Sequence, residues 1–86
     1  MIEDCYMAIL NNTANIFTTS QYHALCKCIE NYIRNDKWVA ENKSALKALE
    51  RKHVIEITDE SYRVYEFKFS DYIKRLIDEV LGKVVK

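Results

Sequence analysis

The chain has 86 residues, of which 49% are hydrophobic and 12% aromatic, so it is long enough for one hydrophobic core and too short for two. Its 13 basic residues are balanced by 13 acidic residues, which argues against an indiscriminate binder of polyanions. The start is acidic, and no apolar run approaches the roughly 18 to 20 residues that a bilayer requires. We therefore expect residues 1–86 to form a single cytoplasmic domain that does not bind membranes.

The cysteines Cys5, Cys26 and Cys28 are odd in number and lack the spacing of a secreted disulfide framework, so reduced thiols are expected. Together with His23, two of them suggest a zinc site, because thiolate and imidazole are zinc ligands. On a helix, however, Cys26 and Cys28 would lie about 200° apart and could not share one ion. We expect Cys28 to be buried, Cys26 to lie near the surface, and neither a metal nor another cofactor to be required.

The first half of the chain is predicted to be mainly helical. Apolar residues at helical spacing predict a helix over residues 2–12, and a brief strand is expected at residues 16–18. Candidate N-caps at residues 18–20 begin a second helix that continues to about Arg34. A polar break then predicts a turn anchored by the apolar residues 38–39. The buried face of the second helix is expected to carry Ala24, Leu25, Cys28, Ile29, Tyr32 and Ile33.

A basic helix is predicted over residues 42–52. Ala45, Leu46 and Leu49 share one face of this helix, which should pack against the core. The segment 43–53 holds four basic residues and one acidic residue, the largest basic excess in the chain. Because three of these basic residues recur every four positions, they should line the opposite, exposed face: Lys43, Lys47 and Arg51.

A β-hairpin is predicted after the basic helix. Two runs rich in β-branched and aromatic residues, 54–57 and 62–69, flank a polar segment centred on Asp59 and Glu60. The hairpin would therefore have an acidic tip. The register that this loop predicts sets Ile57 opposite Tyr62, Ile55 opposite Val64, and Glu56 opposite Arg63.

The last helix is expected to begin at Ser70 or Asp71 and to end at Gly82. Its apolar stripe could cover the core of the same chain. It also has more apolar positions than one hairpin face should cover, which favours a homodimer whose seam includes the first helix. The residues expected in that seam are Tyr72, Ile73, Leu76, Ile77 and Val80.

The order of these elements, and the run of residues Ala45 to Glu56, resemble the winged-helix family of helix-turn-helix domains over about residues 19–69. The resemblance implies an α+β fold, mainly helical, in which the hairpin is the wing. It also implies that helix 42–52 enters the major groove of double-stranded DNA while the wing contacts the flanking DNA. The residues expected to contact DNA are Lys43, Ser44, Lys47 and Arg51 on the helix and Arg63 on the wing.

The end of the basic helix differs from the family pattern. Winged-helix domains favour glycine where this chain has His53. We therefore expect His53 either to adopt a left-handed backbone conformation or to end the helix in another way.

The sequence favours a binding function over catalysis. Cysteine and histidine pairs lack an oxyanion-hole motif and an orienting third group, and with Gly82 as the one glycine there is no phosphate-binding glycine loop. The leading hypothesis is a sequence-specific, DNA-binding transcription regulator. The alternative is a non-enzymatic protein-interaction module on the same scaffold, either a small inhibitor of phage or plasmid type or a domain appended to an ATPase. Net neutrality, the acidic hairpin and the six tyrosines favour this alternative.

Overall fold

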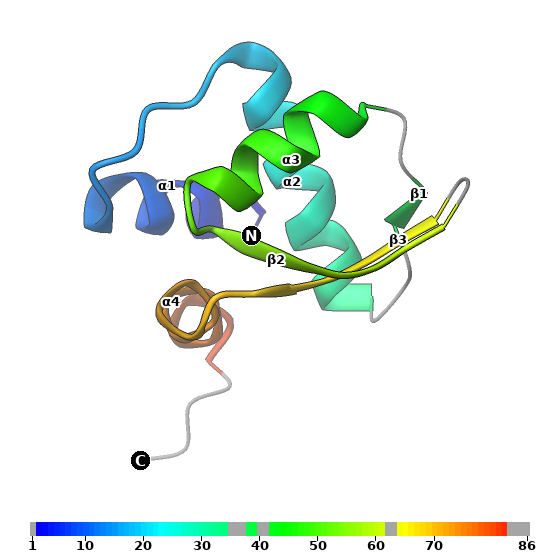
Figure 1. The fold of residues 1–86 in the computed structure, drawn as a ribbon. Helices are drawn as coiled ribbons and strands as arrows, with labels where there is room; N and C mark the ends of the chain where they lie inside the picture. Colours follow the sequence, from blue (N-terminus) through cyan, green and yellow to red (C-terminus); the bar gives the residue numbers. More distant parts are fainter. Residues whose placement is uncertain (1, 35–37, 40–41, 62–63, 83–86) are drawn as a thin grey trace.

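The computed structural model describes residues 2–34, 38–39, 42–61 and 64–82, which form four helices and one antiparallel sheet (Figure 1). The prediction of an α+β domain, in which helices precede a hairpin and one helix follows it, is confirmed. In chain order the elements are α1 (Ile2–Asn12), α2 (Thr19–Arg34), β1 (Trp38–Val39), α3 (Lys43–Arg51), β2 (Ile55–Glu60), β3 (Val64–Phe69) and α4 (Asp71–Leu81).

The start of α2 is determined by a reciprocal cap. The Gln21 amide donates to Thr18 Oγ1, and the Thr18 amide donates to Gln21 Oε1, both at 3.2 Å. The predicted strand over residues 16–18 is wrong, because this segment is irregular and its last amide is used by the cap. Phe17 packs against the core, whereas Ile16 is 81% exposed.

The sheet has the strand order β1-β3-β2. Residues 38–39, which were predicted to anchor a turn, instead form β1, with Trp38 opposite Tyr65 and Val39 opposite Val64. This strand is only two residues long, so its own sequence carries little β signal. Its pairing depends on β3, which lies more than twenty residues further along the chain.

The predicted hairpin register is wrong, as are its pairs Ile57 with Tyr62, Ile55 with Val64, and Glu56 with Arg63. The observed partners are Ile55 with Phe69, Glu56 with Lys68, Ile57 with Phe67, Asp59 with Glu66, and Glu60 with Tyr65, with an irregularity between Ile57 and Asp59.

Burial explains this difference in register. The observed pairing directs Tyr65 and Phe69 into the core, whereas the predicted pairing would have placed the alternate positions Glu66 and Lys68 there. Strand β2 consequently runs through Asp59 and Glu60, which were expected at the hairpin tip.

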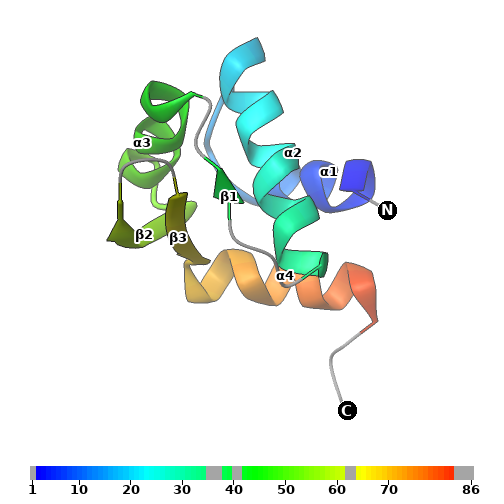
Figure 2. The ribbon, with the colours of Figure 1, turned by 90° about the vertical axis from the view of Figure 1, so that its right-hand side faces the viewer.

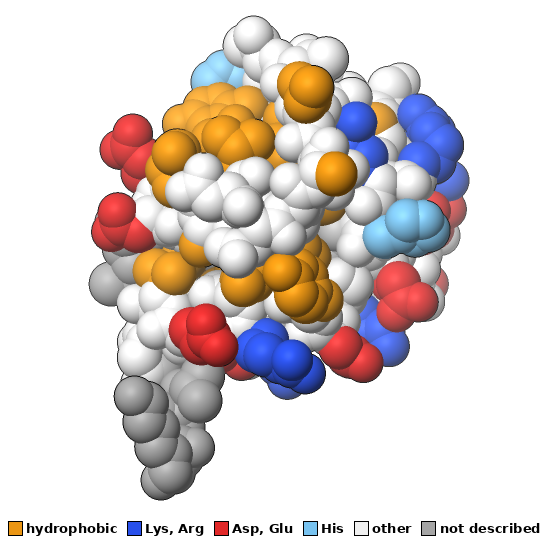
Figure 3. Space-filling model, turned by 90° about the vertical axis from the view of Figure 1, so that its left-hand side faces the viewer, with side chains coloured by type: hydrophobic (Ala, Val, Ile, Leu, Met, Phe, Trp, Pro, Cys, Tyr) orange, Lys and Arg blue, Asp and Glu red, His pale blue; other side chains and the backbone are white. Residues whose placement is uncertain are grey.

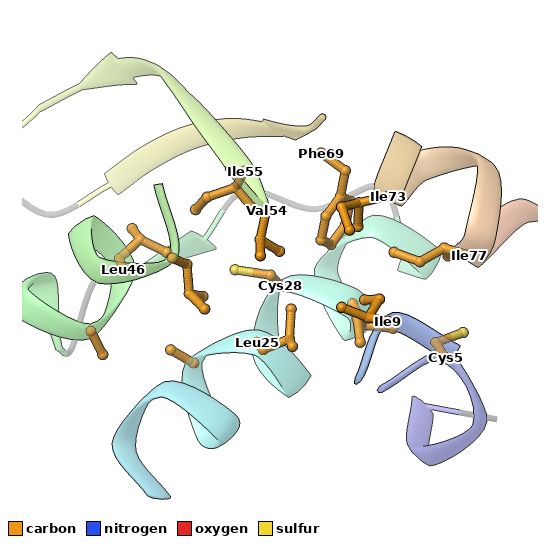
Figure 4. Packing of buried hydrophobic residues seen from close by; sticks show 14 of the residues in the cluster. Cys5, Ile9, Leu25, Cys28, Leu46, Val54, Ile55, Phe69, Ile73 and Ile77 are labelled. Carbon is orange, nitrogen blue, oxygen red and sulfur yellow. The ribbon is translucent and has the colours of Figure 1, made fainter. Parts of the chain in front are cut away.

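The core is formed by all four helices and the hairpin. Figure 4 shows Leu25 and Cys28 of α2 between Leu46 of α3 on one side and Ile9 of α1 on the other. Helix α4 packs against α1 and β3, and in Figure 2 it runs along the lower edge of the molecule. The side chains with at most 1% exposure are Cys5, Ile9, Leu25, Cys28, Ile29, Leu46, Leu49, Val54, Ile55, Tyr65 and Ile77.

Helix α3 has well-defined ends. Its N-cap is Asn42, whose side-chain oxygen accepts a 3.1 Å hydrogen bond from the Ala45 amide. At the other end, His53 has a φ of 62°, so it adopts the left-handed conformation that was one of the two expectations. The His53 amide donates to the Glu50 carbonyl and the Val54 amide to the Leu49 carbonyl, which is the bonding of a Schellman motif. This turn directs the chain from α3 into β2.

Candidate nucleic-acid interface

The exposed face of α3 carries the four helix residues predicted to contact DNA. Lys43, Ser44 and Arg51 are exposed and Lys47 is partly buried. The opposite face is held against the core by four buried residues, Ala45, Leu46, Ala48 and Leu49. The apolar face therefore fixes which side of the helix the basic residues present.

The four residues of α3 that were predicted to contact DNA line a hollow of about 440 Å³ between α3 and the hairpin. The hairpin contributes two further residues to the hollow, Glu60 and Tyr65, which were not predicted as site residues. Arg63, the residue predicted to contact DNA from the wing, lies outside the described residues.

A network of polar contacts joins α3 to the hairpin. Lys47 Nζ lies 3.2 Å from each carboxylate oxygen of Glu60, and the Tyr65 hydroxyl donates a 2.7 Å hydrogen bond to Glu60 Oε1. The hydrogen bond from Tyr65, followed by that from Lys47, lowers the pKa of the Glu60 carboxyl. The same hydrogen bond raises the pKa of Tyr65, because it favours the protonated hydroxyl. Glu60 is therefore held as a carboxylate and in a defined position.

Lys43 also lies close to Tyr65, with its Nζ 5.9 Å from the centre of the aromatic ring. The hollow thus combines three basic side chains with one carboxylate, and it keeps a local positive excess. The chain as a whole has no net charge. This excess is the electrostatic feature that distinguishes the hollow from the average surface of the protein.

A second hollow, of about 420 Å³, lies beside the C-terminal end of α3 and has a different charge. Its lining includes Glu50 and Glu56, together with Lys68, whose Nζ lies 3.2 Å from Glu56 Oε2. Glu50 Oε2 accepts a 3.0 Å hydrogen bond from the Ile57 amide, so this carboxylate ties α3 to β2. Within the described residues, the two hollows place acidic and basic groups of the same helix on different surfaces.

The connection between α2 and α3 is longer than the three or four residues typical of a helix-turn-helix. Helix α2 ends at Arg34 and α3 begins at Lys43, so residues 35–42, eight in number, separate them. Strand β1 lies within this connection and joins the hairpin sheet. The link between the helices is therefore anchored to the sheet.

The structure separates the residues predicted to form a dimer seam. Ile73 and Ile77 are 2% and 0% exposed and belong to the chain's own core, and Leu76 is partly buried against it. Tyr72 and Val80 are 49% and 39% exposed. The homodimer stays a prediction, and these two residues are the ones of the predicted seam that a second chain could reach.

Helix α1 also has an exposed apolar residue, and its C-terminal end is bonded to α4. Met7 of α1 is 43% exposed, and the Tyr72 hydroxyl donates to the Asn12 carbonyl at the end of α1. Figure 3 shows hydrophobic side chains gathered over the middle of this side of the molecule, with charged side chains around them.

The cysteines are arranged as predicted. Cys28 is buried and Cys26 is partly exposed; Cys5 is buried as well. Burial raises the pKa of all three thiols, so they are less readily ionised than free cysteine. Across the described residues, no group of three or more histidine, cysteine or acidic side chains could hold a metal ion.

The helices that the structure describes include none with the length and apolar character needed to cross a membrane. Comparisons of the chain with protein-family models, with curated proteins and with solved structures give no match.

Proposed function

We propose that this chain is a sequence-specific DNA-binding regulator of the winged-helix type, with α3 as the helix that enters the major groove. The observation that carries this proposal is the alignment of Lys43, Lys47 and Arg51 along the exposed face of α3, at a spacing of four residues. Lysine and arginine neutralise phosphates or reach the acceptors of guanine, and Ser44 can donate to a phosphate oxygen. Occupancy of the DNA site would then block or recruit the transcription machinery.

The buried face of α3 supports the proposed role. A recognition helix must keep its orientation so that its side chains can contact base edges. Four buried residues hold α3 against the core, which meets this requirement. The Lys47–Glu60 ion pair and the Glu50 hydrogen bond to β2 add contacts between the helix and the hairpin. The basic side chains would thus be presented to DNA by a helix whose orientation is fixed.

The test is a charge reversal of the basic face. The variant Lys43→Glu/Lys47→Glu/Arg51→Glu is expected to bind duplex DNA much more weakly. The magnitude of the slope of log K against log salt should decrease by about three, because each phosphate contact contributes about one unit. Binding is measured by fluorescence anisotropy of a labelled duplex from low to physiological salt, and circular dichroism checks that the helices remain.

A matched control changes the net charge of the protein by the same amount as this triple variant. In Lys27→Glu/Lys74→Glu/Arg75→Glu the three exposed basic residues lie on α2 and α4, outside the hollow. This control is expected to retain most of the salt-dependent binding. Equal losses in both triple variants would mean that net charge, rather than the α3 face, determines affinity.

A second candidate function is a protein-interaction module. It is favoured by the pairing of Lys47 with Glu60, which removes part of the basic excess, and by the exposed apolar residues Met7, Ile16 and Tyr72. Absence of duplex binding by the unmodified protein at low salt would favour this candidate over the regulator.

A further inference from the structure

An acidic side chain lies among the basic residues of the proposed DNA-binding surface. Glu60 lines the same hollow as Lys43, Lys47 and Arg51. A carboxylate at this position would repel DNA phosphates and would offset part of the charge of Lys47, with which it is paired. Glu60 would thus lower non-specific affinity for DNA, and a contact to a base edge would compensate for that loss.

The contacts of Glu60 hold its carboxylate in place and leave it accessible. Tyr65 is 1% exposed, and its hydroxyl reaches the carboxylate from the protein interior at 2.7 Å. Lys47 lies on the α3 side of the carboxylate. The Glu60 side chain is nevertheless 47% exposed. A carboxylate can accept about four hydrogen bonds, so a ligand in the hollow can still donate to it.

We infer that Glu60 is a specificity-determining acceptor that selects cytosine in the major groove. This inference rests on the proposed function. Cytosine presents its N4 amino group there as a donor, whereas guanine and thymine present acceptors that a carboxylate repels. Adenine also has an amino donor, but its N7 acceptor lies beside it and faces a carboxylate unfavourably. The base edge that best matches a fixed carboxylate is therefore that of cytosine.

Tyr65 is a positioning residue for this contact. Its ring is buried in the core, and its hydroxyl determines where Glu60 Oε1 lies. Lys47 lies beside the carboxylate, and because its ammonium has three donors it could also donate to an adjacent phosphate or guanine. Glu60 and Lys47 would thus act on neighbouring groups of the same DNA site.

The experiment is a selection of bound duplexes from a randomised library, followed by affinity measurements on the selected site and its single-base variants. The unmodified protein is expected to prefer cytosine at one position by about tenfold. Glu60→Gln should bind random duplex more tightly, because a negative charge is removed. It should also change the preference at that position from cytosine to adenine, since glutamine pairs with adenine N6 and N7.

Three further variants separate position from charge. Glu60→Ala should lose the cytosine preference without gaining one for adenine. Tyr65→Phe keeps the charge and the buried ring, so it should weaken the preference without raising affinity for random duplex. Glu56→Gln is the matched control, because Glu56 lies on the same strand in an ion pair of the same length but lines the other hollow. It should leave the preference unchanged.

Two results would overturn the inference, and they are distinguishable. If Glu60→Gln and Glu60→Ala strengthen binding to all duplexes equally and leave base preference unchanged, Glu60 acts only as a repulsive charge, and the proposed function stands. If the unmodified protein binds no duplex at low salt, the proposed function fails as well. Thermal denaturation of each variant shows that altered preference is measured on folded protein.

Discussion

Helices α3 and α4 are both amphipathic and both end at a residue with a left-handed backbone, yet they contribute differently to the molecule. Helix α3 buries four of its nine residues, whereas α4 buries two of its eleven. The exposed part of α3 carries basic residues in a line, while α4 mixes two basic with three acidic residues. Amphipathicity alone thus does not set α3 apart from α4; the segregation of charge on the exposed face does.

The largest expected effect compares a buried position of α3 with an exposed position of α4. Leu49 of α3 is fully buried, so Leu49→Ala should destabilise the domain by about 2–5 kcal/mol through lost burial and a cavity. Val80 of α4 is 39% exposed, and Val80→Ala should cost less than about 0.5 kcal/mol. Urea denaturation followed by circular dichroism measures both values. Similar losses for the two variants would contradict the difference in burial between these two positions.

A smaller effect is expected where a hydrogen bond attaches α4 to α2. The Tyr32 hydroxyl donates to Asp78 Oδ1 at 2.7 Å, and Tyr32→Phe should cost about 1 kcal/mol. Tyr72→Phe is the control, because its hydroxyl bond to the Asn12 carbonyl is exposed and should contribute less. If the Tyr72 variant proved the less stable of the two, the exposed bond to α1 would contribute more than the partly buried bond to α2, contrary to this expectation.

The hydrogen bond between Tyr32 and Asp78 predicts that the stability of the domain decreases at alkaline pH. Burial and the hydrogen bond to Asp78 raise the pKa of Tyr32 from 10.0 to about 12. The folded protein therefore holds this proton more tightly than the unfolded chain does. The contribution of Tyr32 is complete below pH 10 and is lost as the pH rises from 10 to about 12. In urea titrations at several pH values, Tyr32→Phe should reduce this alkaline loss without abolishing it, because the pKa values of Tyr65 and of the three thiols are also raised.

The smallest effects concern the two helix ends. Gly82, with a φ of 71°, follows α4 in open space, so Gly82→Ala should cost roughly 0.5–1 kcal/mol through backbone strain alone. His53, with a φ of 62°, bears the same strain after α3, and His53→Gly should stabilise the domain by a similar amount. The midpoint of thermal unfolding measures both changes. A destabilised His53→Gly variant would show that the imidazole makes a compensating contact.

Local features of the sequence predicted the helices well. The caps at Thr18 and Asn42 and the terminator Gly82 act within a few residues of the helix ends, and the 3.6-residue period of apolar side chains set the buried faces. The exposure of Lys43 and Arg51 followed from the same period. Four of the six residues that line the candidate site were therefore evident from one helix.

The sheet and the remaining part of the site depended on contacts between distant segments. The run from Tyr62 to Phe69 has apolar residues at both odd and even positions, so its alternation fitted two registers. Only the core, which accepts Tyr65 and Phe69, selected between them. That choice extended β2 to Glu60 and placed its carboxylate against Lys47, thirteen residues earlier in the chain. Helices form from neighbouring residues, but strand pairing and the contacts that follow from it are decided by the packing of the whole domain.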